Sequence, residues 1–334
     1  KKKEKKFSLD FFIKKKKICN KYLYSIQKKK IKLLPNFIFE SFYNFLVLIG
    51  ENDHICGSSN GDRDTKHVME NSKPVMKISK KDNIKGFDFL RSLGIESKSK
   101  IVLVYVRDRA YYNHKPSSDF RNSNIKNFIP TINYLTSKGF YVFRMGSKVD
   151  KSLNLKNNKF FDYSTNGMRS EFLDVFLAMN CYFCISTGSG FDALPMIARK
   201  PVLLVSFAPI GYLWSFSSTT IHIFKHHYDI QRKKKLSIKE IFQLGLGQSL
   251  NTQDYLMKGV KLIENSSTEI KNATKEMYMY LKNKKRISNN MYHKKFFSLI
   301  DKNAISTDNK KIHNKFNCMV SNSFLKKNKY LFRL

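Results

Sequence analysis

The feature that most constrains the fold is a regular alternation of short apolar runs and segments with helical spacing between Ile101 and Val205. The apolar runs are rich in β-branched and aromatic residues, which is typical of buried strands. Alternating strands and helices of this length predict an α/β fold, in which a parallel sheet carries helices on both faces. The expected strands are Ile101–Val106, Phe140–Met145, Phe160–Tyr163, Tyr182–Ser186 and Pro201–Val205, with Ile221–Phe224 as a candidate sixth, and the expected helices cover residues 126–138, 172–177 and 191–199.

The remaining sequence predicts four regions along the chain. Residues 1–36 are basic and are expected to be loosely ordered, and residues 37–100 form a smaller amino-terminal region that is helical or α/β and is short for a complete domain. Residues 101–285 form the Rossmann-like domain, with helices expected from Thr252 to Glu264 and from Ser266 to Leu281, the second one beginning with a capping box. Residues 286–334 are rich in Lys and Asn and are expected to be a loosely ordered tail.

The apolar and aromatic segment Pro35–Gly50 has two interpretations. It is either a core helix or an amphipathic segment that lies in a membrane interface beside the basic residues before it. It is too short to span a bilayer, and no other apolar run is long enough either. The chain has no initiating Met and no cleavable signal pattern, which is compatible with a fragment.

The net charge of +36 arises from 62 basic and 26 acidic residues, and it allows three interpretations. An excess of Lys over Arg, together with abundant Asn, Ile and Phe, is what an AT-rich genome produces, and surface Lys usually faces solvent. A nucleic acid or an anionic membrane would also attract such a chain. No known nucleic-acid-binding motif is visible, so nucleic acid is not the expected partner, whereas peripheral contact with an anionic inner membrane stays open.

The five cysteines are scattered, and their odd number argues against a disulfide framework and for a reducing, cytoplasmic compartment. Cys181 and Cys184 form a single CxxC at a strand entry, so they are expected to be buried apolar residues. The adjacent His226 and His227 lack a third ligand at metal-binding spacing. We therefore expect no metal and no cofactor.

The turn Thr187-Gly188-Ser189-Gly190 is the strongest candidate for a binding site, because it joins an expected strand to an expected helix. Amide groups at a helix N-terminus lack internal partners and attract phosphate, and glycine allows a ligand to approach the backbone. Gly188, Gly190 and Ala193 also satisfy the dinucleotide pattern GxGxxA, but no acidic residue follows at the distance that ribose binding requires. A phosphate-bearing ligand other than a dinucleotide is the better prediction.

Two further strand ends carry polar residues that would meet this turn at the carboxyl edge of a parallel sheet. Arg107 and Asp108 follow the first strand, and Arg144 and Gly146 close the second. Arginine offers a planar fork of donors that suits a diphosphate. The stretch after the first strand adds Asp119, Arg121 and Asn122, and the expected helix after the turn begins near Asp192. From these residues alone, Asp108 or Asp119 is a candidate general base and Arg121 a further anion ligand. Asn122 or Ser123 is a candidate helix cap, and Asp192 is either a cap or an acceptor for a ligand hydroxyl.

Several long segments resemble a family of bacterial glycosyltransferases that occur with surface-polysaccharide genes. The resemblance runs from about Pro35 to Leu281 and is densest between Ile101 and Val205, in the segments YVRDRAYYN, DFRNSNIKNFIPTINYLTSKGFYVFRMGS, FFDYSTNGMRSEFLDVFLAMN and CISTGSGFDALPMIARKPVLLV. It implies a GT-B-like architecture, in which two Rossmann-like halves hold a nucleotide-sugar between them. The motif positions in this chain are Arg107, Asp108, Asp119, Arg121, Asn122, Arg144, Gly146, Arg169, Gly188, Ser189 and Gly190.

The resemblance also sets the expected function. It implies a metal-independent transferase that moves a sugar from a nucleotide-sugar donor to a glycan or lipid-linked acceptor. Aliphatic residues or Ser often replace Arg109 in the family pattern, which favours Arg107 as the phosphate ligand. Two alternatives remain open at this point, a non-catalytic nucleotide-sugar-binding subunit and a basic nucleic-acid-binding protein.

Overall fold

The chain divides into two compact units, Lys1–Asp62 and Arg63–Leu334. The structure is a computed structural model, and it describes residues 18–28, 40–42, 44–45, 48–49, 64, 68–74, 76–111, 116–286, 290–306 and 309–333. In the first unit these include α1 (Lys21–Lys28) and helical residues between 40 and 48. The second unit contains residues 63–100 together with the sheet domain, and most of the basic residues 1–36 lie outside the described ranges.

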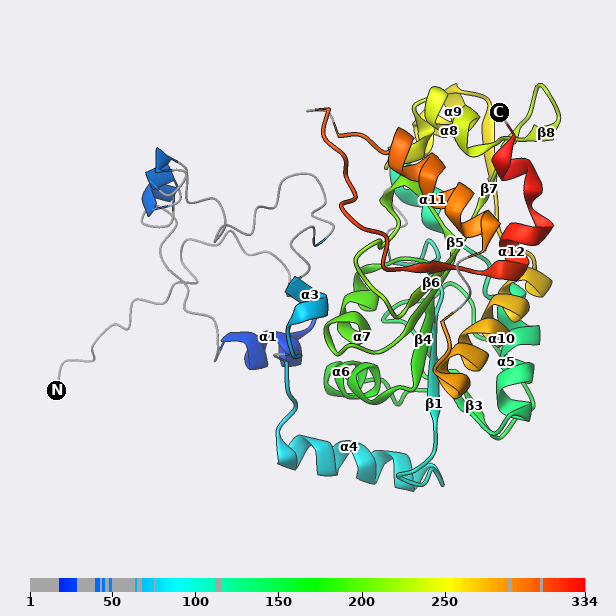
Figure 1. Ribbon diagram of the computed structural model, residues 1–334. Coiled ribbons are helices and arrows are strands. Elements are labelled where there is room, and N and C mark those ends of the chain that lie inside the picture. Colours follow the sequence, from blue (N-terminus) through cyan, green and yellow to red (C-terminus); the bar gives the residue numbers. More distant parts are fainter. Residues whose placement is uncertain are drawn as a thin grey trace. The chain divides into compact units, whose positions relative to one another are not determined.

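A seven-stranded parallel sheet forms the centre of the second unit (Figure 1). Its strand order is β10-β6-β5-β4-β1-β2-β3, so the first six strands along the chain follow the doubly wound order of Rossmann-like folds. The direction of winding reverses between β1 and β4, and ligands of such sheets bind near this point. The strands are β1 (Ile101–Tyr105), β2 (Tyr141–Met145), β3 (Phe160–Phe161), β4 (Phe183–Ser186), β5 (Val202–Phe207), β6 (Thr220–Phe224) and β10 (Met319–Val320).

All six predicted strands are confirmed, and their nearly continuous apolar sequences reflect burial on both faces. Helices α5 (Ile129–Ser137) and α10 (Ser267–Asn283) pack together on one face, where α5 contacts β2 and α10 contacts β5 and β6. On the other face, α6 (Glu171–Asn180) contacts β1, α4 (Lys80–Ser92) and α7 (Ala193–Ile197). Figure 1 shows these two groups flanking the sheet. The α/β class predicted from the sequence is therefore confirmed.

The predicted helix from Thr252 to Glu264 was wrong. Helix α9 (Thr252–Met257) is capped by Asn251 and ends before Gly259, whose φ of +64° suits glycine. Strand β9 (Val260–Ile263) follows and pairs antiparallel with β7 (His226–Asp229), which also pairs with β8 (Lys234–Lys235). This small second sheet is joined to the first, because the Asn265 side chain accepts from Ser206 N at 2.7 Å and donates to Phe224 O at 2.9 Å.

The prediction of a loosely ordered tail was also wrong for the part of residues 286–334 that the structure describes. Strand β10 pairs with β6, and α11 (Met291–Asn303) buries Phe296 and Ile300. Helix α12 (Asn322–Lys327) buries Phe324 in the same core. These residues therefore complete the domain. The other short helices of this unit are α3 (Val68–Asn71), α8 (Ile238–Gln243) and the 3₁₀ helices Pro116–Arg121, Ile125–Phe128, Gly190–Asp192, Ile210–Tyr212, Leu246–Gln248 and Lys329–Phe332.

The described residues contain one Rossmann-like domain, so the two-domain GT-B arrangement stays a prediction. Within the same residues, no helix has the length and apolar character needed to cross a membrane.

Candidate functional site

The loops that follow β1 and β4 are joined by hydrogen bonds at the carboxyl edge of the sheet. The Arg107 N–H donates to Thr187 Oγ1 at 2.9 Å, and the Arg107 carbonyl accepts from Ser123 N at 2.8 Å. The Arg107 Nε donates to Asn122 Oδ1 at 3.2 Å. The sequence-predicted residues Arg107, Asn122 and Thr187 therefore do come together, as expected for neighbouring strand ends.

Asn122 connects this network to two more segments. Its Nδ2 donates to Asp119 Oδ1 at 2.7 Å, and its carbonyl accepts from Lys225 Nζ. Lys225 follows β6 directly and is buried, and burial lowers the pKa of its ammonium to about 8, with a smaller contribution from the Arg107 charge and an opposing one from Glu264. Lys225 was not predicted as a site residue, although its position at the end of an expected strand could have indicated it.

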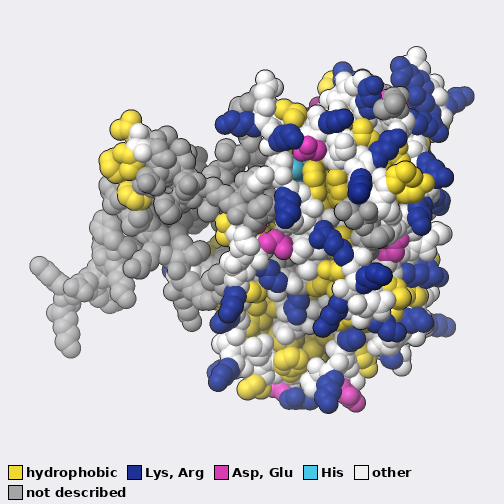
Figure 2. All heavy atoms as spheres, viewed as in Figure 1, with side chains coloured by type: hydrophobic (Ala, Val, Ile, Leu, Met, Phe, Trp, Pro, Cys, Tyr) yellow, Lys and Arg dark blue, Asp and Glu magenta, His cyan; other side chains and the backbone are white. Residues whose placement is uncertain are grey.

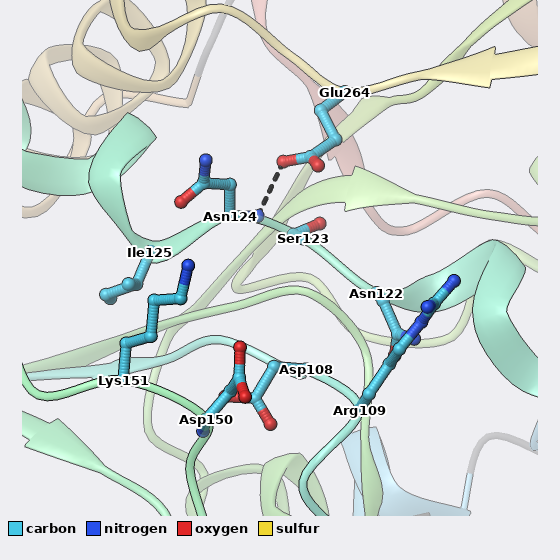
Figure 3. A pocket seen from close by; sticks show the side chains of 9 residues that line it. All are labelled: Asp108, Arg109, Asn122, Ser123, Asn124, Ile125, Asp150, Lys151 and Glu264. Carbon is cyan, nitrogen blue, oxygen red and sulfur yellow. Dashed lines mark hydrogen bonds between the residues drawn. The ribbon is translucent and has the colours of Figure 1, made fainter. Parts of the chain in front are cut away.

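A cleft of about 490 Å³ opens beside this network (Figure 3). Figure 3 shows Glu264 facing Asp108, Asp150 and Lys151 across the cleft, with Arg109 at one end. Loops after β1, β2 and β9 supply these side chains, and the cleft thus lies at the carboxyl edge beside the reversal of strand order. The full lining is Asp108, Arg109, Asn122, Ser123, Asn124, Ile125, Asp150, Lys151 and Glu264.

The acidic groups of the cleft are held by hydrogen bonds. Asp108 accepts from Ala110 N at 3.0 Å and from Asp150 N at 2.9 Å, and Glu264 accepts from Asn124 N at 2.8 Å. These bonds fix the carboxylates at defined positions. Glu264 Oε2 also accepts from Asn127 Nδ2 at 3.1 Å, whereas each Asp108 oxygen keeps a lone pair for a further donor. Asp150, Lys151 and Glu264 were not predicted from the sequence, because the loops that carry them show no motif.

Ser123 offers an additional hydrogen-bonding group. It lines the cleft, it is 8% exposed, and its buried hydroxyl has no hydrogen-bond partner in the described structure. An unsatisfied buried hydroxyl costs stability, and such groups call for an explanation. A ligand in the cleft would supply the missing partner.

The two predicted general bases differ in their surroundings. Asp119 forms an ion pair with Arg109 at 2.9 Å in addition to its bond from Asn122, and it does not line the cleft. Asp108 lines the cleft and has no ion pair among the described residues. The geometry therefore favours Asp108 over Asp119 as a group that could accept a proton from a ligand.

Most amide groups of the turn after β4 already donate hydrogen bonds within the protein, which corrects the sequence prediction of an open phosphate site. Gly188 N donates to Ser186 Oγ at 3.3 Å, Ser189 N to Asp192 Oδ2 at 2.6 Å, and Phe191 N to Ser189 Oγ at 3.1 Å. Ser189 and Asp192 form a capping box on the 3₁₀ helix Gly190–Asp192, and the α-helix that follows has only five residues. Asp192 thus acts as a cap, and the turn does not present an open phosphate cradle.

Asp192 is buried close to a stacked pair of aromatic rings. The carboxyl of Asp192 is completely buried, which raises its pKa to about 6, while the Ser186 and Ser189 hydrogen bonds and the nearby Arg121 charge act in the opposite direction. The rings of Tyr105 and Phe191 stack at 5.2 Å. Arg121 therefore lies near the turn, as the sequence predicted, but next to the cap.

Arg144 and Gly146 have internal roles in place of the predicted contact with phosphate. The Arg144 side chain is 1% exposed and pairs with Asp162 at 3.0 Å, and it also donates to the Lys151 carbonyl. A Cβ at Gly146 would lie 2.7 Å from Val149, so glycine is needed for packing at that position. These residues order the loop that carries Lys151 to the cleft.

The other candidate residues lie outside the cleft lining. Arg169 pairs with Asp174 at 2.6 Å beside the start of α6. His226 and His227, predicted to lie on a loop, are buried in β7, where His226 contacts Glu269 and Tyr330. Tyr112 and His114, which follow Arg109 closely in the sequence, lie outside the described residues. No three His, Cys, Asp or Glu side chains come together as metal ligands in the ranges that the structure describes.

Comparisons with protein-family models, with curated proteins and with solved structures found no match to this chain. The family resemblance therefore stays an expectation.

Proposed function

We propose that the protein is a glycosyltransferase that uses a nucleotide-sugar donor and binds it in the cleft between Asp108 and Glu264. The observation that carries this proposal is the position of a polar cleft at the carboxyl edge of a doubly wound sheet, beside the reversal of strand order. Its lining also suits both halves of such a donor. Carboxylates and amides pair with sugar hydroxyls, and a diphosphate would pair with Lys151 and with Arg109, which then exchanges its ion pair with Asp119 for the ligand. Arg107, which the sequence favoured as the phosphate ligand, does not line the cleft.

The proposed reaction assigns a role to each group. Asp108 removes the proton from an acceptor hydroxyl, whose oxygen then attacks the anomeric carbon of the donor. The bond from that carbon to the diphosphate oxygen breaks, and the diphosphate leaves with the electron pair. Arg109 and Lys151 stabilise the negative charge that develops on it. The Ser123 hydroxyl donates a hydrogen bond to the bound nucleotide-sugar. The acceptor, a glycan or a lipid-linked sugar, enters from solvent.

Donor binding is tested by thermal shift and calorimetry against UDP, GDP, CDP, ADP and their sugars. One of these ligands should raise the melting temperature of the wild type. Lys151→Met should weaken binding of that ligand about 10- to 100-fold, because a hydrogen bond to a charged group contributes about 1.5–3 kcal/mol. Lys148→Met is the matched control, since this exposed lysine lies in the same loop but does not line the cleft.

Turnover is measured as release of the nucleoside diphosphate from the donor that binds. Asp108→Asn should retain donor binding and lower turnover by about 100-fold or more. Failure of the whole panel to bind, or equal binding by Lys151→Met and wild type, would refute the proposal. Binding to the wild type without turnover on any acceptor would support the non-catalytic subunit instead.

A further inference from the structure

Lys225 is a buried cation at the carboxyl edge of the sheet. Figure 2 shows Lys and Arg side chains spread over the surface of the second unit, which is the usual place for these residues. Lys225, by contrast, is only 6% exposed and lies directly after β6. Because burial lowers the pKa of its ammonium to about 8, keeping this charge in place costs stability at neutral pH.

The Lys225 ammonium contacts the segment of residues 122–124, which lines the cleft and is called the wall segment below. Its Nζ donates to the Asn122 carbonyl. The Asn122 side chain accepts from Arg107 Nε at 3.2 Å and donates to Asp119 at 2.7 Å. The first residue of the wall segment is thereby held through both its main chain and its side chain. A charged donor also forms a stronger hydrogen bond to a carbonyl than a neutral donor does.

The next two residues of the wall segment are held from other strand ends. Ser123 N donates to the Arg107 carbonyl at 2.8 Å, and Asn124 N donates to Glu264 at 2.8 Å. Figure 3 shows Asn122, Ser123 and Asn124 in succession beside the cleft. The Ser123 hydroxyl, which is buried and has no partner in the described structure, lies between these fixed points. Its position therefore depends on the bonds on either side of it.

From this arrangement we infer that Lys225 is a positioning residue, which holds the wall segment so that the Ser123 hydroxyl meets the ligand. The inference rests on the proposed function only in that the cleft binds a nucleoside diphosphate. Lys225 does not line the cleft, so it acts through Asn122 and not by direct contact. A purely structural role would not explain a buried charge, because a neutral side chain avoids the cost of burying it.

Calorimetry with the nucleoside diphosphate that binds the wild type tests the inference. Lys225→Met and Ser123→Ala should each weaken binding about tenfold, which is the order expected for the loss of one hydrogen bond. The double variant should bind about as weakly as either single variant, because both changes remove the same contact. Lys225→Arg should bind more tightly than Lys225→Met, since arginine keeps a cationic donor.

The matched control is Lys261→Met. Lys261 is an exposed lysine on β9, the strand that precedes Glu264, and it does not line the cleft. Its substitution removes the same charge from the second unit without touching the wall segment, so this variant should bind like the wild type. Thermal unfolding at pH 7 should place Lys225→Met close to the wild type, because the lost hydrogen bond is offset by the removal of a buried charge.

Hydrogen exchange without ligand separates this inference from the proposed function. In Lys225→Met the amides of Ser123 and Asn124 should exchange faster than in the wild type, while those of β1 should exchange at the wild-type rate. If no nucleoside diphosphate binds the wild type, the proposed function fails. Faster exchange at these two amides would then still support the hold of Lys225 on the wall segment, and unchanged exchange would overturn it.

Three results with a bound nucleoside diphosphate would overturn the inference. The first is wild-type binding by Lys225→Met, and the second is wild-type binding by Ser123→Ala. The third is a Lys225→Met variant that unfolds at a much lower temperature and whose loss of binding adds to that of Ser123→Ala, which would assign Lys225 a structural role.

Discussion

The ion pair between Arg144 and Asp162 allows the clearest test of how the site is built. Only 1% of the Arg144 side chain and 9% of the Asp162 side chain are exposed. Asp162 Oδ2 also accepts from Leu153 N at 2.6 Å, and Arg144 donates to the Lys151 carbonyl. Because Arg144 holds this loop from inside, its substitution should lower the stability of the loop first and weaken ligand binding only as a consequence.

The expected magnitude follows from the burial of the pair. Removing one partner of a buried ion pair leaves the other charge without compensation, which costs about 3–5 kcal/mol. Arg144→Met and Asp162→Asn should therefore each lower the free energy of unfolding by about that amount, which corresponds to roughly 6–20 °C in melting temperature for a domain of this size. The double variant should recover part of the loss, because no unpaired charge remains in it.

Urea unfolding followed by circular dichroism measures these differences. Arg91→Met is the control, because Arg91 forms an exposed ion pair with Asp88, and its loss should change the free energy of unfolding by less than about 1 kcal/mol. The reasoning fails if Arg144→Met is as stable as this control but selectively loses nucleotide binding. That result would mean that Arg144 contacts the ligand, as the sequence alone suggested.

Three further predictions test the capping box, the packing and the carboxy-terminal residues. Burial raises the folded-state pKa of Asp192 to about 6, above its unfolded value near 3.9. The wild type should therefore lose up to about 3 kcal/mol of stability relative to Asp192→Asn as pH rises from about 4 to 6. Unfolding titrations at several pH values measure this, and a difference that does not change with pH would contradict it. Gly86→Ala should cost about 1–3 kcal/mol in chemical denaturation because its Cβ would lie 2.3 Å from the Phe176 ring, whereas Gly190→Ala meets nothing within 4 Å and should cost less than about 1 kcal/mol. Phe324→Ala should cost about 3–5 kcal/mol in thermal unfolding, and an unchanged melting temperature would show that α12 does not belong to the core.

The strands were predictable from the sequence because burial on both faces makes them apolar without interruption. Val102, Val104 and Ile185 lie in such runs, and each is fully buried. Their alternation with helices then leaves few topologies open, since parallel crossovers have one preferred hand. The same local logic failed at residues 252–264, where Gly259 separates a short helix from a strand that pairs only with residues far along the chain.

The carboxy-terminal residues were wrongly predicted to be loosely ordered, because their average composition does not reveal the few apolar residues that pack against the domain. Lys and Asn dominate this stretch, but Phe296, Phe324 and Leu331 occur at intervals and are buried against the sheet domain. Each of these contacts joins segments that are distant in the sequence, so no local sequence pattern predicts it. The hydrogen bonds to the amides of the turn after β4, by contrast, could have been predicted from the sequence, because Ser189 and Asp192 have the spacing of a capping box.

The sequence identified part of the candidate site through the polar residues after β1, whereas the tertiary structure adds residues from loops without motifs. Asn122 is the connecting point, since it bonds to Arg107, Asp119 and Lys225, which come from three separate segments. Two of these partners are buried cations, and the Arg107 charge contributes to the lowered pKa of Lys225. A neutral hydrogen-bond donor in place of Arg107 or Lys225 could hold the loop at Asn122 at a smaller electrostatic cost. Clusters of this kind are enriched at functional sites, where burial and like charges are retained because a ligand benefits from them. The two buried cations lie behind the cleft and do not line it, and Glu264 offsets part of the burial effect at Lys225, so their charges favour the proposed anionic ligand only through the positive potential that they create near it.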